Sequence, residues 1–180
     1  LAAGTVLPTE GTVFLSLADG DKPAGIVVAR RLRELGLGIA ATTGTADYLA
    51  SFGVDVDAVV GKVSDGHGIN AVNLIAGGDI AFVVNTPQGQ GSGARSDGEQ
   101  IRKAAITHRV SSVTTVEAAL AAVQGMAEHV GHDLAEVEEE RAVRRRGVEP
   151  PEHADHLDAQ QSQKFFVHPR SPFKRVIHEG

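Results

Sequence analysis

The fold is decided by residues 12–45, which read TVFLSLADGDKPAGIVVARRLRELGLGIAATTGT. Two apolar runs, TVFLSLA and GIAAT, flank an amphipathic stretch, and each run ends in a polar turn. This alternation is typical of parallel strands joined by a helix. We therefore expect the two polar turns, DGDK (19–22) and TTGT (42–45), to open at the same edge of one sheet.

The two turns carry residue types suited to binding an oxyanion, which needs fixed positive charge and many short donors. Lys22 starts the expected first helix and supplies the charge, Thr42 and Thr45 supply hydroxyls, and Gly44 allows close approach of the backbone. The residues alone leave two alternatives open. Thr45 is equally suited to be the N-cap of the next helix, and most surface lysines are simply solvated.

The alternation continues to about residue 130. We expect strands at 12–17, 38–42, 57–60, 80–85 and 110–114, and helices at 22–36, 45–52, 69–77, 96–108 and 115–129. Gly36 is placed to end the first helix, and the continuously apolar AFVV (81–84) indicates that helices cover both faces of the sheet. The sequence therefore predicts a three-layer α/β fold with a five-stranded, mainly parallel sheet.

Composition narrows the classes of function. The formal charge of −6 argues against a general nucleic-acid binder, and the lack of Cys excludes disulfides, thiol catalysis and Cys-based zinc sites. No apolar stretch approaches the roughly 20 residues that span a bilayer, and no signal peptide is evident. We expect a cytoplasmic protein with small-molecule partners and no nucleic acid or membrane partner. Its start at Leu1 is expected for a fragment of a longer polypeptide.

A change in composition near Val130 predicts a domain at 1–130 and a poorly structured tail at 131–180. The tail has 15 apolar residues in 50 and five of the eight histidines. A charged helix is expected at 133–146, and the proline pair at 150–151 ends it. His153 and His156 have a helical spacing suited to a metal, but the neighbouring prolines favour a solvated tail, so we expect no metal site.

Asn85 and Thr86 end the fourth strand with polar groups, where open α/β sheets bind ligands. An Asx turn is an equally good interpretation of Asn85. The following segment 89–94 matches GxGxxA, the loose dinucleotide fingerprint, but it lies several residues after the fourth strand rather than directly after the first. A Gly-rich loop over the site is therefore favoured over a nicotinamide site.

Five segments, in order, carry a family resemblance: GTVFLSLADGDK, ATTGTADYL, GKV, AFVVNTPQG and SDGEQIRKAAITHRVSSVTT. Together they resemble the C-terminal, methylglyoxal-synthase-like regulatory domain of the carbamoyl-phosphate synthase large chain, from about Leu7 to about Glu128. The resemblance implies a Rossmann-type fold and a non-catalytic site for an effector such as UMP or IMP. The implied effector-binding residues are Lys22, Thr42, Gly44, Thr45, Lys62, Asn85 and Thr86. Some members of the family have Thr and Ser where this chain has Pro87 and Gln88, and this departure bears on which effector binds.

The resemblance also implies a parent enzyme, a glutamine-dependent carbamoyl-phosphate synthase. That enzyme is an ATP-dependent ligase using Mg²⁺ or Mn²⁺, has a glutaminase small subunit and serves pyrimidine and arginine biosynthesis. The fragment itself is expected to need no cofactor. The alternative is a stand-alone methylglyoxal-synthase-like lyase acting on dihydroxyacetone phosphate. Asp19 matches that lyase family, but Ala18 replaces its preceding His, and KVSDGHG (62–68) lacks its GGD motif.

Overall fold

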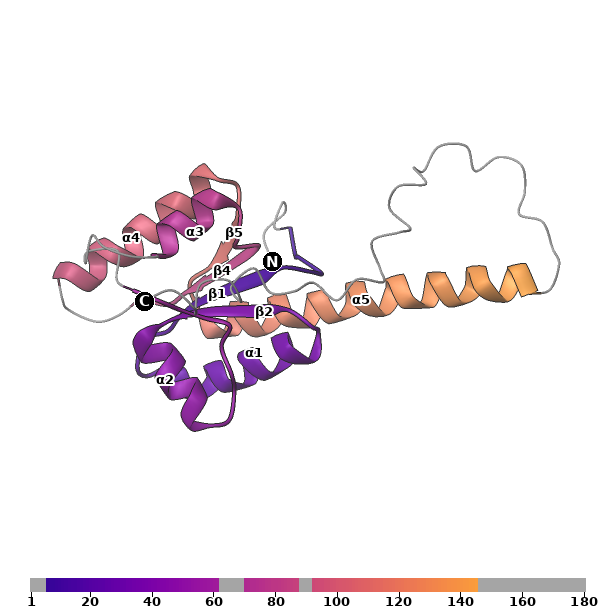
Figure 1. The fold of residues 1–180 in the computed structure, drawn as a ribbon, viewed down its shortest axis with the longest axis horizontal. Helices are drawn as coiled ribbons and strands as arrows, with labels where there is room; N and C mark the ends of the chain where they lie inside the picture. Colours follow the sequence, from indigo (N-terminus) through magenta and orange to yellow (C-terminus); the bar gives the residue numbers. More distant parts are fainter. Residues whose placement is uncertain (1–5, 62–69, 88–91, 146–180) are drawn as a thin grey trace, which may run out of the picture.

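The computed structural model describes residues 6–61, 70–87 and 92–145. In these residues five strands alternate with five helices (Figure 1). The elements are β1 Thr12–Ser16, α1 Lys22–Glu34, β2 Gly38–Thr42, α2 Thr43–Ser51, β3 Ala58–Val60, α3 Ala71–Gly77, β4 Phe82–Asn85, α4 Ser92–Thr107, β5 Ser111–Val113 and α5 Val116–Arg145.

The sheet has the order β3-β2-β1-β4-β5, and all four strand pairs are parallel. The central strand β1 lies between β2 and β4, and Val13 pairs with Ile39 on one side and with Phe82 on the other. The predicted five-stranded parallel sheet is therefore confirmed. The chain first builds the sheet outward from β1 to β3, then crosses back to add β4 and β5 on the opposite side of β1.

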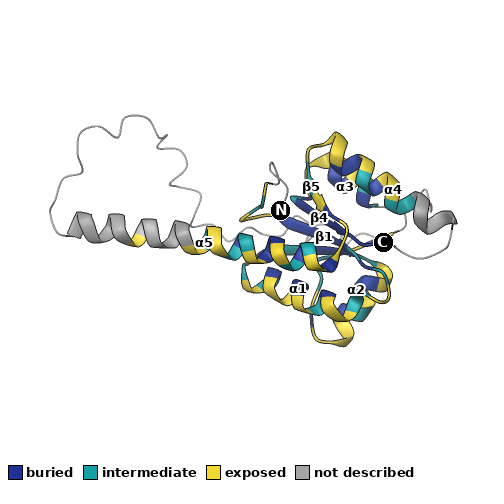
Figure 2. Cartoon of the chain, turned by 180° about the vertical axis from the view of Figure 1, so that it is seen from behind, coloured by how far each residue is buried: buried dark blue, intermediate teal, exposed yellow. Residues whose placement is uncertain are grey.

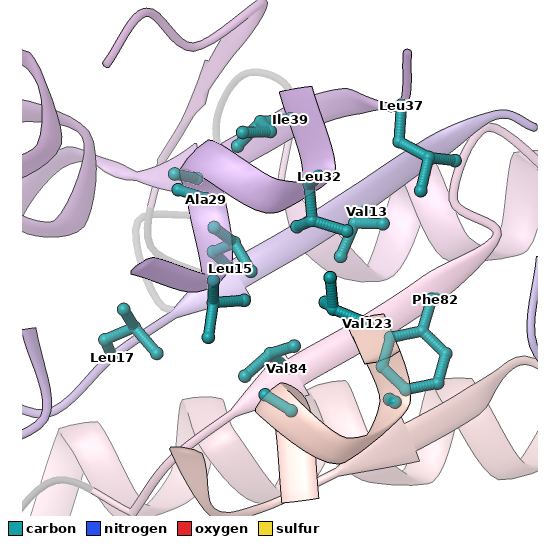
Figure 3. Packing of buried hydrophobic residues seen from close by; sticks show 14 of the residues in the cluster. Val13, Leu15, Leu17, Ala29, Leu32, Leu37, Ile39, Phe82, Val84 and Val123 are labelled. Carbon is teal, nitrogen blue, oxygen red and sulfur yellow. The ribbon is translucent and has the colours of Figure 1, made fainter. Parts of the chain in front are cut away.

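Helices cover both faces of the sheet, as the continuous apolar strands predicted. Helices α1, α2 and α5 contribute to one buried cluster, whereas α3 and α4 contribute to the other (Figure 1). Successive β1 residues alternate between them: Val13 and Leu15 belong to the first cluster, which Figure 3 shows, and Phe14 belongs to the second. Figure 2 shows the buried strands enclosed between the two helical layers.

Gly36 ends α1 as predicted. It has a φ of 78°, its N–H donates to the Arg33 carbonyl at 3.0 Å, and the Leu37 N–H donates to the Leu32 carbonyl at 2.9 Å. This is the Schellman arrangement, which needs a left-handed residue just beyond the helix and so favours glycine. Helix α4 ends in the same way, but Arg109 takes the left-handed position with a φ of 57°.

Most helix bounds differ from those expected, usually by one or two residues: α1, for example, ends at Glu34 instead of 36, and α3 begins at Ala71 instead of 69. Helix α2 begins at Thr43 instead of 45, and α4 begins at Ser92 instead of 96. The expected loop at 86–95 is therefore wrong in its last part, because Ser92, Gly93 and Ala94 form the first turn of α4.

The largest difference is in α5, which replaces the two expected helices at 115–129 and 133–146 with one helix. It contains no proline, and a single glycine such as Gly131 costs a helix only about 1 kcal/mol. The ribbon of α5 extends well beyond the sheet (Figure 1). The division of the chain at residue 130 stays a prediction, because a helix crosses that position.

No described helix is both long enough and apolar enough to span a bilayer.

Candidate functional site

The predicted site lies where the strand order reverses. β1 and β4 are neighbours, but α1 follows β1 onto one face of the sheet and α4 follows β4 onto the other. In open α/β sheets, ligands bind in the crevice beyond the carboxyl ends of two such strands. Ser16 at the end of β1 pairs with Asn85 at the end of β4, so the loops that follow these two residues start side by side.

Two buried threonine hydroxyls hold the loop that follows β1. The Leu17 N–H donates to Thr45 Oγ1 at 3.0 Å, and the Ala18 N–H donates to Thr86 Oγ1 at 2.7 Å. Both threonines are only 1% exposed. The Thr86 N–H in turn donates to the Ser16 carbonyl at 2.9 Å. Thr45 and Thr86 therefore tie the β1 loop to α2 and β4, one on each side.

The alternative interpretation of Thr45 as an N-cap is wrong. Thr42 is the N-cap residue of α2, with φ −63° and ψ 150°, and Thr45 lies in the first turn. Helix α2 begins two residues earlier than expected, so Thr45 lies within the helix. Its side chain faces inward, and its oxygen accepts a hydrogen bond from the Leu17 N–H. The Thr42 hydroxyl donates to the same Thr45 oxygen at 3.1 Å, so the two predicted threonines are in contact.

Lys22 reaches from the first residue of α1 towards the start of α2. A Cβ placed on Gly44 would lie 3.5 Å from Lys22 Nζ, so the ammonium lies next to the glycine in the first turn of α2. Lys22 Nζ also lies 2.7 Å from Asp19 Oδ1 and 5.9 Å from the centre of the Tyr48 ring. The structure thus brings together Lys22, Thr42, Gly44 and Thr45, which the sequence assigned to two separate turns.

The two helices that start beside Lys22 lack side-chain caps. In the described segment 6–61, neither Asp21 at α1 nor Thr42 at α2 makes a capping hydrogen bond with its side chain. By contrast, the Asn70 side chain caps α3, and Thr115 Oγ1 accepts from the Ala118 N–H at the start of α5. The first amides of a helix carry partial positive charge and need acceptors. At α1 the Lys22 N–H already donates to the Ala18 carbonyl and Pro23 has no N–H, so it is chiefly the start of α2 that leaves donors for another acceptor beside a fixed cation.

Asn85 lies at the same edge of the sheet, but its side chain is hydrogen-bonded to α4. It is buried, and its Nδ2 donates to the Gly98 carbonyl at 3.0 Å, which attaches α4 to the end of β4. A Cβ placed on Gly98 would lie 3.5 Å from Asn85 Nδ2, so the Asn85 side chain packs directly against the backbone of α4. In the structure, the Asn85 side chain contacts α4 and does not form the Asx turn that was the alternative interpretation.

Several expectations fall on other parts of the chain. The whole of KVSDGHG (62–68), which includes Lys62, lies outside the described residues, as do the first part of the Gly-rich segment and His153 with His156. Among the residues that are described, no three His, Cys, Asp or Glu side chains lie close enough together to hold a metal ion.

Sequence reasoning missed two neighbours of Lys22. Tyr48 was not considered, although its position four residues after Gly44 puts it one helical turn away on the same face of α2. Asp19 was considered only as a match to the lyases. Its spacing of three residues from Lys22 was the available signal for an ion pair.

Comparisons with known proteins identify the family of this chain. The family model of the MGS-like domain matches residues 25–114, which is half of the chain. The chain therefore belongs to the MGS-like domain family, and the predicted resemblance is confirmed.

Its relatives are large chains of one enzyme. Over 126 residues it is 47% identical to the carbamoyl phosphate synthase large chain, C-terminal section, of Methanopyrus kandleri, covering 70% of this chain and 23% of that protein. It is 49% identical over 124 residues to the carbamoyl phosphate synthase large chain of Beutenbergia cavernae, covering 67% of this chain and 11% of that protein. For the same protein of Rubrobacter xylanophilus the identity is 44% over 125 residues, covering 69% of this chain and 12% of that protein. The chain thus spans less than a quarter of the length of these relatives.

Proposed function

We propose that this domain binds a nucleotide monophosphate, such as UMP or IMP, or a similar anion, as the effector-binding domain of a glutamine-dependent carbamoyl-phosphate synthase. The observation that carries the proposal is the Lys22 ammonium beside the start of α2, where two neighbouring helices lack side-chain caps. Fixed charge and the uncapped amides at the start of α2 together favour a phosphate group. The names of the relatives support the synthase as the setting.

In this proposal the residues have different tasks. Lys22, the Thr42 hydroxyl and the backbone around Gly44 contact the phosphate, and Lys62 adds a second positive charge. Thr45 and Thr86 keep the loop after β1 in place, because their oxygens already accept from its amides. Each hydroxyl still has a proton, so either is able to donate to the ligand as well. Asn85 orients α4 beside the ligand.

The proposed partners are the remainder of the synthase large chain and its glutaminase small subunit. The ligase reaction, with ATP and Mg²⁺ or Mn²⁺, takes place in that remainder, in the cytoplasm, for pyrimidine and arginine biosynthesis. If the effector changes the affinity of the synthase for a substrate, that substrate changes the affinity for the effector by the same factor. This reciprocity is what defines the domain as a regulator.

Calorimetry tests the proposal with UMP and IMP, the matching nucleosides, and the variants Lys22→Ala and Lys103→Ala. Lys103 is an exposed lysine of α4 and serves as the matched control. Losing a hydrogen bond to a charged group costs about 1.5–3 kcal/mol, so Lys22→Ala should weaken monophosphate binding roughly ten- to a hundredfold. Lys103→Ala should have little effect. Added salt should weaken the wild type more than Lys22→Ala, since the contact is ionic.

Three outcomes would contradict this function. The proposed phosphate site would be contradicted by equal affinity for the nucleoside and the monophosphate. It would also be contradicted if Lys22→Ala bound the monophosphate as well as the wild type does. Methylglyoxal formation from dihydroxyacetone phosphate above a protein-free blank, abolished by Asp19→Asn, would favour the lyase. That reaction needs a carboxylate base, and Asp19 is the carboxylate in contact with the Lys22 ammonium.

A further inference from the structure

The ion pair between Asp19 and Lys22 is strongly asymmetric. The Lys22 side chain is 14% exposed, whereas the Asp19 side chain is 88% exposed, although Lys22 Nζ and Asp19 Oδ1 are 2.7 Å apart. The cation is thus held against the protein, while its counter-ion lies on the solvent side.

The surroundings of Lys22 explain why the ammonium stays in place. The Tyr48 ring lies 5.9 Å from Nζ, and the Gly44 backbone lies on the α2 side. The turn below it is compact, because the Asp21 and Lys22 N–H groups both donate to the Ala18 carbonyl, at 2.9 and 3.2 Å. Ala18 is itself attached to Thr86. Rotation of the Asp19 side chain alone therefore suffices to uncover the ammonium, and the backbone need not move.

We propose that Asp19 is the internal counter-ion of the anion site: it neutralises Lys22 when the site is empty, and the incoming phosphate displaces it. This inference rests on the proposed function and adds a residue that sets the affinity for the effector. Exposed ion pairs are weak, so a phosphate dianion is able to replace the carboxylate. The displaced carboxylate still repels the ligand from a short distance. Asp19 thereby weakens effector binding and shifts the response to higher effector concentrations.

Calorimetry on the whole chain with UMP, and separately with inorganic phosphate, tests this with Asp19→Asn and the control Asp21→Asn. Both variants lose one negative charge in the same turn, but Asp21 forms no ion pair with Lys22 in the described structure. Asp19→Asn should tighten binding of both probes about two- to tenfold, and Asp21→Asn less than twofold. In a Lys22→Ala background, Asp19→Asn should change affinity no more than Asp21→Asn does.

The outcomes separate the two proposals. If the wild type binds neither probe, or if Lys22→Ala binds as well as the wild type, the proposed function fails. If Lys22→Ala loses binding but Asp19→Asn binds no tighter than the wild type, only the counter-ion role is contradicted. If Asp19→Asn and Asp21→Asn tightened binding equally, the loss of one negative charge would explain both changes. That result would also contradict the counter-ion role of Asp19. Melting temperatures of the variants identify any loss of folding.

Discussion

Thr86 carries a buried hydroxyl that joins β4 to the loop after β1. Its Oγ1 accepts from the Ala18 N–H at 2.7 Å, while its own N–H donates to the Ser16 carbonyl at 2.9 Å. These two bonds cross the point where the strand order reverses. The position of Asp19 and Lys22 above the sheet therefore depends on a residue about 65 positions further along the chain.

At the residue scale, Thr86→Val should lower the free energy of unfolding by about 1–2 kcal/mol. Valine keeps the shape, but the Ala18 N–H loses its acceptor in a partly buried place. The matched control is Thr43→Val, because Thr43 is exposed in the first turn of α2 and should change stability by less than about 0.5 kcal/mol. Urea unfolding of the three proteins measures the difference. Equal stability of both variants would show that the Thr86 hydroxyl contributes nothing.

The helices of this domain differ in the residue that takes the left-handed conformation just after each helix ends. Gly36 and Gly53 occupy the left-handed positions after α1 and α2, where glycine has no steric cost. Arg109 occupies the corresponding position after α4. A left-handed residue with a side chain costs of order 1 kcal/mol or more, so the end of α4 is strained where the ends of α1 and α2 are not.

At the element scale, Arg109→Gly should raise the free energy of unfolding by about 1 kcal/mol, because glycine relieves this strain. Arg109→Ala removes the same side chain but keeps a Cβ, so it should give no comparable gain. Thermal unfolding followed by circular dichroism distinguishes the two. A gain of the same size in both variants would attribute the effect to loss of the arginine side chain instead of to backbone strain.

The described part of the molecule combines a three-layer domain with the long helix α5. Among the α5 side chains that the structure describes, the buried ones are Val116, Ala119, Ala122, Val123 and Met126. From Ala127 to Gly131 no described side chain of α5 is fully buried. The described contribution of this helix to the core therefore ends at Met126.

At this scale, a chain ending after Val130 should melt within a few degrees of the full chain, because it keeps every described buried residue of α5. A chain ending after Ala122 should be far less stable, since it loses Val123 and Met126, and buried Met or Leu truncations alone cost about 2–5 kcal/mol. Thermal melts of the three lengths provide the comparison. A drop of ten degrees or more for the Val130 chain would mean that residues 131–180 pack against the domain.

Much of the fold was predictable because its signals are local. The bounds of β2, 38–42, agree with the structure because an apolar run follows a glycine and ends in polar threonines. The cluster of Lys22, Thr42 and Gly44 was also predictable, since parallel strands direct their carboxyl ends to one edge. The inward orientation of Thr45 and the attachment of Asn85 to Gly98 were missed, because each depends on where a helix begins or how it packs.

The sequence by itself determined the alternation of strands and helices, the burial of both sheet faces and the presence of a cation and donors at two helix starts. These features follow from the hydrophobic period, from turn residues and from the common direction of parallel strands. Only the tertiary structure decided that β1 lies between β2 and β4, and hence that Thr45 and Thr86 hold the same loop from opposite sides. Strand order depends on contacts between residues far apart in the chain, and local patterns carry no information about which distant partners give the best-packed sheet.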